Sequence, residues 1–328
     1  MNRRTFVVTL GSGLLGAPGS ARAQGRKVSR VGWVGAWYSR SGAATFLDAF
    51  RQGMRDRGYI EGQNLTIDAR WMESVSPDEA ASITAELVRS KVDVLVAQGA
   101  AIFGVKAAAG SVPVVFGYSG DPVAAKLVAS LARPGGNLTG ITFLTLELAG
   151  KRVELLKEAA PRISRVAILF NPLHIGEEEA VRETQTATQR LGLPLQPFAV
   201  HSIAEVTAAL DTMVRGRING VVALPNALIM LQRNAIAEFA VRHRVPTISG
   251  WEDFAIVDGN LMTYGPNLQE AWRYLARLVD KVLKGAKPSD LPVEQPTTYQ
   301  LIINLKTAKA LGLTIPQSLM LRADRLIE

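Results

Sequence analysis

Short aliphatic runs alternate with amphipathic stretches along most of the chain. The run at residues 30–35 is followed by Phe46, Phe50 and Met54, which recur every four residues and therefore share one face of a helix. A second strand is expected at residues 64–71. Strands that alternate with helices in this way predict βαβ units, in which helices cover both faces of a parallel sheet.

The alternation continues far along the chain and falls into two similar series. Further strands are expected at residues 93–98, 113–117, 138–142, 165–170, 194–200, 219–224, 245–249 and 261–264. Further helices are expected from residue 77, at residues 103–109, after Pro122, and at residues 147–159, 176–191, 204–214, 229–242 and 268–283. Two such series predict an α/β protein with two doubly wound parallel-sheet lobes.

No long flexible linker separates the two series. The strand at residues 261–264 and the helix at 268–283 are expected to return to the first lobe, after which the chain crosses again near Pro292. The predicted bounds are residues 28–143 with 261–287 for lobe 1, and residues 146–258 with 292–328 for lobe 2. Several crossings of this kind make a hinge that lets two lobes close around a ligand.

The first residues have the pattern of an export signal. Arg3 and Arg4 precede an uncharged run at residues 5–21, and Ala21-Arg22-Ala23 forms a small-x-small cleavage site. This pattern predicts a twin-arginine-like signal peptide over residues 1–23, because four glycines and Pro18 make the run a poor membrane anchor. The G-x-G-x-x-G pattern at residues 11–16 lies inside this segment and is rejected as a dinucleotide site.

The charge and the cysteine content of the chain bear on its partners and on the compartment in which it works. The chain has 328 residues, 48% of them hydrophobic, and a net charge of +8 that falls to +5 without the three signal-segment arginines. Basic residues are interspersed with carboxylates, which argues against a nucleic-acid partner. With no cysteine, the chain has no disulfide, no thiolate metal site and no lipid-carrying cysteine. We therefore expect an exported, soluble periplasmic protein without a lipid anchor.

Several stretches resemble the tryptophan- and tyrosine-type ABC transporter substrate-binding protein family. They lie at residues 120–123, 131–140, 151–157 and 304–316, and the resemblance covers nearly the whole mature chain. It implies a type I periplasmic-binding fold, with a small-molecule solute held in the cleft between the lobes. It also implies delivery of the solute to an ABC permease in the inner membrane, and we expect a monomer that requires no cofactor. The family name does not establish tryptophan as the solute.

Ligands of open parallel sheets lie beyond the carboxyl ends of the strands, so the loops after the strands supply the candidate ligand-binding residues. In lobe 1 these are Trp37, Tyr38, Ser39, Gly99, Ala100, Ala101, Tyr118, Ser119 and Asp121. In lobe 2 they are Asn171, His174, Asn226, Trp251 and Glu252, with Tyr264 near a hinge crossing.

The chemistry of these loops suits an amino-acid-like or aromatic solute. Backbone amides at residues 99–101 and the Ser119 hydroxyl offer donors to a carboxylate, while Asp121 or Glu252 offers an acceptor to an ammonium group. Aromatic walls would come from Trp37, Tyr38 and Trp251, and paired amides from Asn171 and Asn226. Plainer roles stay open: Asp121 before Pro122 as a helix cap, Asn171 before Pro172 as a turn, and the tryptophans as lobe-edge packing.

Two other functions remain as alternatives. A hydrolytic enzyme is disfavoured because the sequence has no G-x-S-x-G elbow, no H-E-x-x-H motif and no cysteine nucleophile. Its three histidines, His174, His201 and His243, are isolated, and the acidic run at residues 177–179 is interpreted as complementing a helix dipole. No catalytic or metal-binding residue is assigned. An exported ligand sensor of the same fold is not separated from a transport protein by the sequence.

Overall fold

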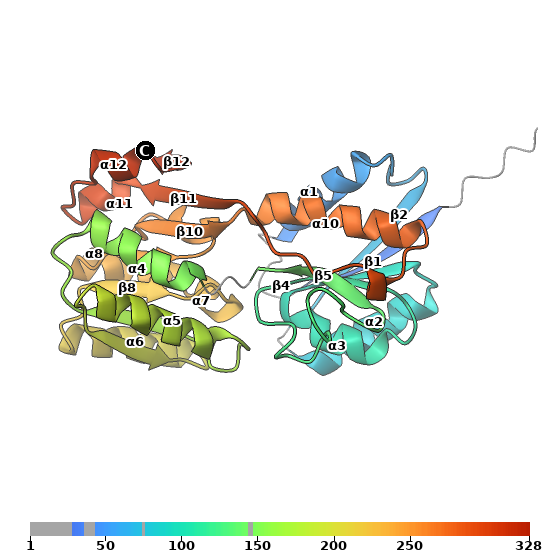
Figure 1. Cartoon of the computed structure of the whole chain (residues 1–328), viewed down its shortest axis with the longest axis horizontal. Coiled ribbons are helices and arrows are strands. Elements are labelled where there is room, and N and C mark those ends of the chain that lie inside the picture. Colours follow the sequence, from blue (N-terminus) through green and yellow to red (C-terminus); the bar gives the residue numbers. More distant parts are fainter. Residues whose placement is uncertain (1–27, 36–42, 74–75, 144–146) are drawn as a thin grey trace, which may run out of the picture.

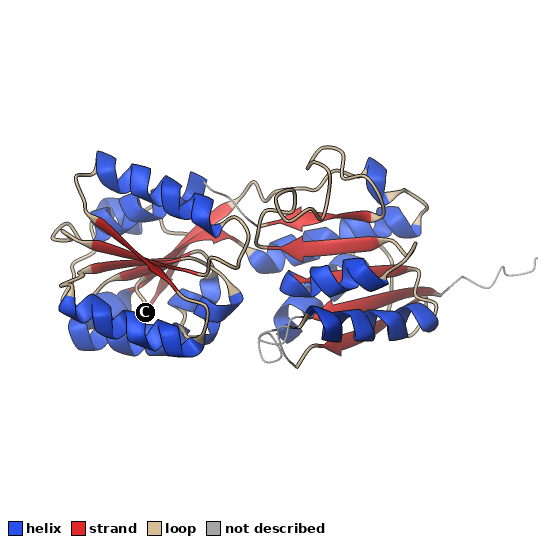
Figure 2. Cartoon of the chain, turned by 90° about the horizontal axis from the view of Figure 1, so that it is seen from below, coloured by secondary structure: helices blue, strands red, loops and turns tan. Residues whose placement is uncertain are grey.

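Two α/β lobes lie side by side in the computed structural model (Figures 1 and 2). The structure describes residues 28–35, 43–73, 76–143 and 147–328. The predicted signal peptide and the predicted site residues Trp37, Tyr38 and Ser39 lie outside the described residues. Within the described parts, no helix is long and apolar enough to cross a membrane.

Lobe 1 contains a five-stranded sheet of order β2-β1-β3-β4-β5, in which every pairing is parallel. The strands are β1 (Ser29–Gly35), β2 (Leu65–Trp71), β3 (Val94–Gln98), β4 (Val114–Tyr118) and β5 (Leu138–Thr142). The helices are α1 (Ala43–Arg55), α2 (Pro77–Arg89), η2 (Gly99–Ala101), α3 (Ile102–Ala108), α10 (Leu268–Leu283) and η3 (Pro288–Asp290). Figure 1 shows α1 and α10 on one face of this sheet and α2 and α3 on the other.

The α1–α10 face of lobe 1 is built around large aromatic side chains. Trp33 of β1 is fully buried, and its ring centroid lies 5.5 Å from that of Phe50 and 5.0 Å from that of Trp272. The two helices approach closely because α1 carries Gly53, where a Cβ would lie 2.1 Å from the backbone oxygen of Arg273. The predicted apolar face of the first helix is therefore the face that packs on α10 and the sheet.

Lobe 2 contains a seven-stranded sheet of order β12-β11-β10-β9-β8-β6-β7. The strands are β6 (Val166–Phe170), β7 (Leu195–Ala199), β8 (Gly220–Ala223), β9 (Thr247–Ser249), β10 (Met262–Pro266), β11 (Tyr299–Asn304) and β12 (Arg325–Ile327). The helices are α4 (Glu147–Ala159), α5 (Glu177–Arg190), α6 (Ile203–Arg215), α7 (Ala227–Leu231), α8 (Arg233–His243), α9 (Glu252–Ala255), α11 (Leu305–Ala310) and α12 (Gln317–Met320). Only the β10–β11 pairing of this sheet is antiparallel.

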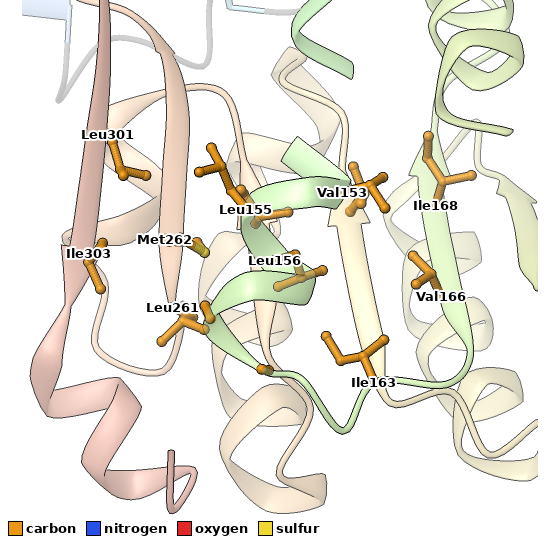
Figure 3. Close-up of a cluster of buried hydrophobic side chains, with 14 of the residues drawn as sticks. Val153, Leu155, Leu156, Ile163, Val166, Ile168, Leu261, Met262, Leu301 and Ile303 are labelled. Atoms are coloured by element: carbon orange, nitrogen blue, oxygen red, sulfur yellow. The ribbon is translucent and has the colours of Figure 1, made fainter. Parts of the chain in front are cut away.

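Helix α4 packs its apolar face on the lobe 2 sheet. Val153 and Leu156 of α4 are buried with Ile168 of β6, Met262 of β10 and Ile303 of β11 in one cluster (Figure 3). This cluster spans strands from three parts of the chain, so the last strands are integral to the lobe 2 core. The predicted class, two doubly wound α/β lobes, is confirmed.

One predicted assignment is wrong: the strand expected at residues 261–264 does not belong to lobe 1. It forms β10, which pairs in parallel with β9 through Met262 and Ile248 and antiparallel with β11 through Met262 and Ile303. Both Leu261 and Met262 are fully buried in the lobe 2 core. The aliphatic pattern predicts that a segment is a strand. Which strands it pairs with depends on packing against residues that are distant in sequence.

Two predicted helices differ from the structure. The helix expected after Pro122 is a series of turns, in which Lys126 takes a left-handed conformation (φ 55°) that ends the helical path. The helix expected at residues 229–242 is divided at Gln232 into α7 and α8.

The chain crosses between the lobes at three places among these elements: between β5 and α4, between β10 and α10, and between η3 and β11. The last crossing segment is bound to lobe 1, because the backbone N–H of Thr142 donates to the carbonyl oxygen of Glu294 at 2.9 Å. Three crossings among the described elements therefore join the lobes, the multiple connection that the sequence predicts.

Candidate ligand-binding site

The lobes touch where β4 and β6 end. Ser119, directly after β4, places its Oγ 2.9 Å from Nε2 of His174, in the loop after β6. Next to this contact, the backbone N–H of Asp121 donates to the carbonyl oxygen of Ile175 at 3.0 Å. Both loops leave the carboxyl ends of parallel strands, where ligands of such sheets bind.

A small cavity lies behind this contact, between the two lobes. Its volume is about 20 Å³, which is room for about one water molecule. The residues that line it come from both lobes: Ser119, Phe143, Arg152, Glu177, Ala180, Leu224, Pro225 and Trp251. The cavity therefore combines aromatic walls with one basic and one acidic side chain.

Arg152 projects from α4 into this cavity and is 5% exposed. Its Nε–H donates to the carbonyl oxygen of Tyr264 at 2.9 Å, which fixes one edge of the guanidinium group against β10. The neighbouring backbone leaves space for it, because a Cβ at Gly250 would lie 2.6 Å from Nη2 of Arg152. Burial lowers the pKa of Arg152 to about 10, so the group stays positively charged at neutral pH.

Glu177 is the first residue of α5 and is 3% exposed. Its carboxylate accepts hydrogen bonds from the backbone N–H of Asn171 at 2.7 Å and from Nδ2 of Asn226 at 2.8 and 3.0 Å. Burial raises the pKa of Glu177 to about 8, against the opposing effects of these hydrogen bonds and of the Arg152 charge. The site thus holds a carboxyl group whose charge is sensitive to what lies beside it.

His174 lies between Ser119 and Glu177. Its Nδ1 is buried 3.3 Å from Oε1 of Glu177 without making a hydrogen bond, and its ring centroid is 5.7 Å from that of Tyr118. Burial lowers the pKa of His174 to about 4, which makes the imidazole neutral at physiological pH. A neutral imidazole has one N–H donor and one acceptor nitrogen, so Nε2 beside Ser119 and Nδ1 beside Glu177 play different roles.

The arrangement suits a zwitterion with an apolar body. A guanidinium group binds a carboxylate through parallel N–H donors, and a buried carboxylate binds an ammonium group. Phe143 and Trp251 supply aromatic surface beside these two charges. Among the described residues, no group of three or more His, Cys, Asp or Glu side chains is placed to bind a metal ion.

The structure brings several predicted site residues together. Ser119 and Trp251 line the cavity, and Asn226 and His174 contact Glu177 directly. Tyr118 packs on His174. Gly99, Ala100 and Ala101 form η2 at the end of β3, with Ala101 fully buried. The role of each of these residues in ligand binding stays a prediction.

Other predicted residues have local partners instead. Oδ1 of Asp121 accepts from the backbone N–H groups of Val123 and Ala124, at 2.8 and 3.0 Å. Oδ1 of Asn171 accepts from the N–H of Leu173 at 3.0 Å. These are the plainer cap and turn roles left open by the sequence.

Two further predicted residues also have partners outside the cavity. The carboxylate of Glu252 pairs with Arg325 of β12. Tyr264 offers its carbonyl oxygen to Arg152, while its ring lies 6.2 Å, centroid to centroid, from the ring of Tyr299.

Sequence reasoning missed Arg152, Glu177 and Phe143. Arg152 had a detectable signal, because it follows Ala149 by three residues and precedes Leu156 by four, and so lies on the apolar face of its helix. A single arginine among buried aliphatic positions marks a buried cation that needs a partner. Glu177 gave a weaker signal, since an acidic residue at a helix start is explained by the helix dipole alone.

Comparisons with known proteins agree with this geometry. The model of the family described as ABC transporter substrate binding protein matches residues 36–327. A relative named "Tyrosine-binding protein" from Clostridioides difficile (strain R20291) is 25% identical over 269 residues, covering 80% of this chain and 75% of the relative.

Two solved structures share the two-lobe fold. An ABC domain in complex with L-Trp from Streptococcus pneumoniae has a TM-score of 0.83 and 25% identity, covering 91% of this chain and 99% of that one. A conserved domain protein from Vibrio cholerae also has a TM-score of 0.83, with 24% identity over 92% of this chain and 100% of that one. The predicted type I periplasmic-binding fold is thereby confirmed.

Proposed function

Because this chain belongs to the family of ABC transporter substrate-binding proteins, we propose that it captures an aromatic amino acid between its lobes and delivers it to an ABC permease. The observation that carries the proposal is a buried guanidinium group and a buried carboxyl group, Arg152 and Glu177, in a cavity lined by residues of both lobes. Arg152 would bind the solute carboxylate and Glu177 its ammonium group. A site with one group for a carboxylate and another for an ammonium fits a zwitterion better than an anion or a cation alone.

Aromatic surface supports a solute with a ring. Phe143 from lobe 1 and Trp251 from lobe 2 face the same cavity, so a ring held between them would contact both lobes. The names of two similar proteins point the same way, since one is a tyrosine-binding protein and the other was solved with L-Trp. L-tryptophan and L-tyrosine are therefore the proposed solutes.

Capture requires the lobes to part. The cavity of about 20 Å³ is far smaller than any amino acid, so the solute would enter an open form and the hinge would then close. Contacts from both lobes give the solute a higher affinity for the closed form, which shifts the population towards it. The closed form would then dock on the permease. The signal-like segment at residues 1–23 supports a periplasmic location for these steps.

Calorimetric titration of the mature protein, from Gln24 onward, tests this proposal. L-tryptophan and L-tyrosine are expected to bind and to raise the melting temperature, because a solute at 100 times its dissociation constant adds about 2.7 kcal/mol of stability. Indole-3-propionate lacks the ammonium group and tryptamine lacks the carboxylate, so both are expected to bind more weakly. Binding of neither amino acid, or equal binding of all four compounds, would overturn the assignment.

A further inference from the structure

The polar contact between the lobes is direct. Ser119 Oγ and His174 Nε2 are 2.9 Å apart, and the adjacent Asp121 N–H to Ile175 O bond is 3.0 Å long. Ser119 and Asp121 belong to lobe 1, whereas His174 and Ile175 belong to lobe 2. These bonds exist only while the lobes are together, and they leave the Ser119 hydroxyl engaged with protein.

His174 extends this contact to the centre of the site. Its second ring nitrogen lies 3.3 Å from Oε1 of Glu177, and the carboxylate of Glu177 accepts from Nδ2 of Asn226. The Tyr118 ring packs against the imidazole, with the ring centroids 5.7 Å apart. Polar groups therefore run from lobe 1 through His174 towards the carboxylate proposed to bind the ammonium group, and the His174–Glu177 step is a close approach of 3.3 Å rather than a hydrogen bond.

The imidazole makes the two ends of this run of polar groups interdependent. If the Ser119 hydroxyl donates to Nε2, then Nδ1 carries the proton and faces Glu177, which suits an ionised carboxylate. If Nε2 instead donates to Ser119, then Nδ1 presents a lone pair to Glu177, which suits a protonated carboxyl group. An ammonium group beside Glu177 keeps the carboxylate ionised and thereby favours the arrangement in which Ser119 donates.

We propose that Ser119 and His174 are a pair of positioning residues whose hydrogen bond closes the lobes and holds Glu177 in place, rather than residues that contact the solute. This inference rests on the proposed function for the identity of the solute. The closing contact itself is a property of the two lobes and is testable without any solute.

A double-mutant cycle with L-tryptophan tests the pair. Ser119→Ala and His174→Phe, which keeps the ring packing on Tyr118, are each expected to lower affinity about 5-fold, the effect of one net hydrogen bond. The double variant is expected to bind no more weakly than either single variant, because the bond is already lost. Ser119→Thr keeps a hydroxyl group and is expected to restore affinity.

Direct contacts from each residue to the solute would instead make the two losses multiply, to about 25-fold, and that result would overturn the proposal. His243→Gln is the matched control, because His243 lies at the end of α8, where its ring packs on Phe239 outside the cavity. This variant is expected to bind as the parent does. Circular dichroism melting of each variant shows whether it is folded.

Lobe distances provide a readout that does not depend on solute identity. The chain has no cysteine, so Ser82→Cys in α2 and Gln185→Cys in α5, both exposed, give one spin label per lobe. With Ser119→Ala added, the distance distribution is expected to shift to longer values, both without solute and at half-saturating L-tryptophan. Identical distributions under both conditions would overturn the closing contact. Failure of every amino acid to bind, with the shift still present, would overturn only the proposed function.

Discussion

Nδ2 of Asn226 donates to both carboxylate oxygens of Glu177, at 2.8 and 3.0 Å. The other end of the same amide is also fixed, because Oδ1 of Asn226 accepts from the backbone N–H of Ile229 at 3.0 Å and caps α7. The start of one helix therefore sets the direction of a carboxylate at the start of another. Such a carboxylate is held in place before a solute arrives, which lowers the entropic cost of binding.

Replacing Glu177 by glutamine should separate charge from shape. Glu177→Gln keeps the size of the side chain but removes the negative charge, so L-tryptophan affinity is expected to fall at least about 10-fold, the scale of a hydrogen bond to a charged group. Indole-3-propionate, which has no ammonium group, is expected to lose little. Calorimetric titration measures both. Glu178→Gln, at the exposed neighbouring position, is the control, and equal losses for both solutes would contradict the assignment.

Arg152→Lys tests the opposite end of the proposed solute. Lysine keeps the positive charge but lacks the planar fork and the Nε–H bond to the Tyr264 carbonyl oxygen. Affinity for L-tryptophan is expected to fall about 10- to 100-fold, with tryptamine affected much less, because tryptamine has no carboxylate. Lys151→Gln, on the exposed side of the same helix, should leave both affinities unchanged. A uniform loss for both compounds would point to a structural role alone.

Local periodicity predicted most elements of the fold because it depends only on neighbouring residues. The expected helix at residues 147–159 and strand at 138–142 have the bounds of α4 and β5. Sheet membership was not predicted correctly for β10, because it depends on pairing with β9 and β11 and on the packing of Met262 among strands that are distant in sequence. Local patterns carry no information on such partners.

The candidate site was predictable only in its location. The rule that ligands lie beyond strand ends led to Ser119, His174 and Trp251, which do gather at or beside one cavity. The same rule also selected Asp121 and Asn171, whose side-chain oxygens are used in their own turns. Arg152 was missed because it lies within α4, whereas the rule selects only loops that follow strands.

Gly53 tests the packing that supports lobe 1. A Cβ at this position would lie 2.1 Å from the backbone oxygen of Arg273, so Gly53→Ala should force α1 and α10 apart and destabilise the protein by about 1–3 kcal/mol. Urea unfolding measures the change. Gly216→Ala is the matched control, because the nearest atom to its Cβ would be the flexible Oε1 of Gln196 at 3.3 Å. An unchanged unfolding midpoint for Gly53→Ala would contradict the close packing.

The buried acid and imidazole at the lobe contact predict opposite effects of pH on stability. Burial raises the pKa of Glu177 from 4.5 to about 8, so the folded protein keeps a proton that the unfolded chain loses, and the stability from this group is lost as pH rises through that window. Burial lowers the pKa of His174 from 6.5 to about 4, so the stability from that group is lost as pH falls from 6.5 to about 4.

These two effects oppose each other between pH 4.5 and 6.5, and only that of Glu177 remains between pH 6.5 and 8. Between pH 4.5 and 6.5, Glu177 and His174 together are therefore expected to change the free energy of unfolding of the solute-free protein very little. Between pH 6.5 and 8 the free energy of unfolding should decline by at most about 1.4 kcal/mol per pH unit. Glu177→Gln should abolish the upper decline, whereas Glu178→Gln should keep it. Urea unfolding at pH 5, 6.5 and 8 measures this difference, and a decline that persists in Glu177→Gln would assign the titration to another group.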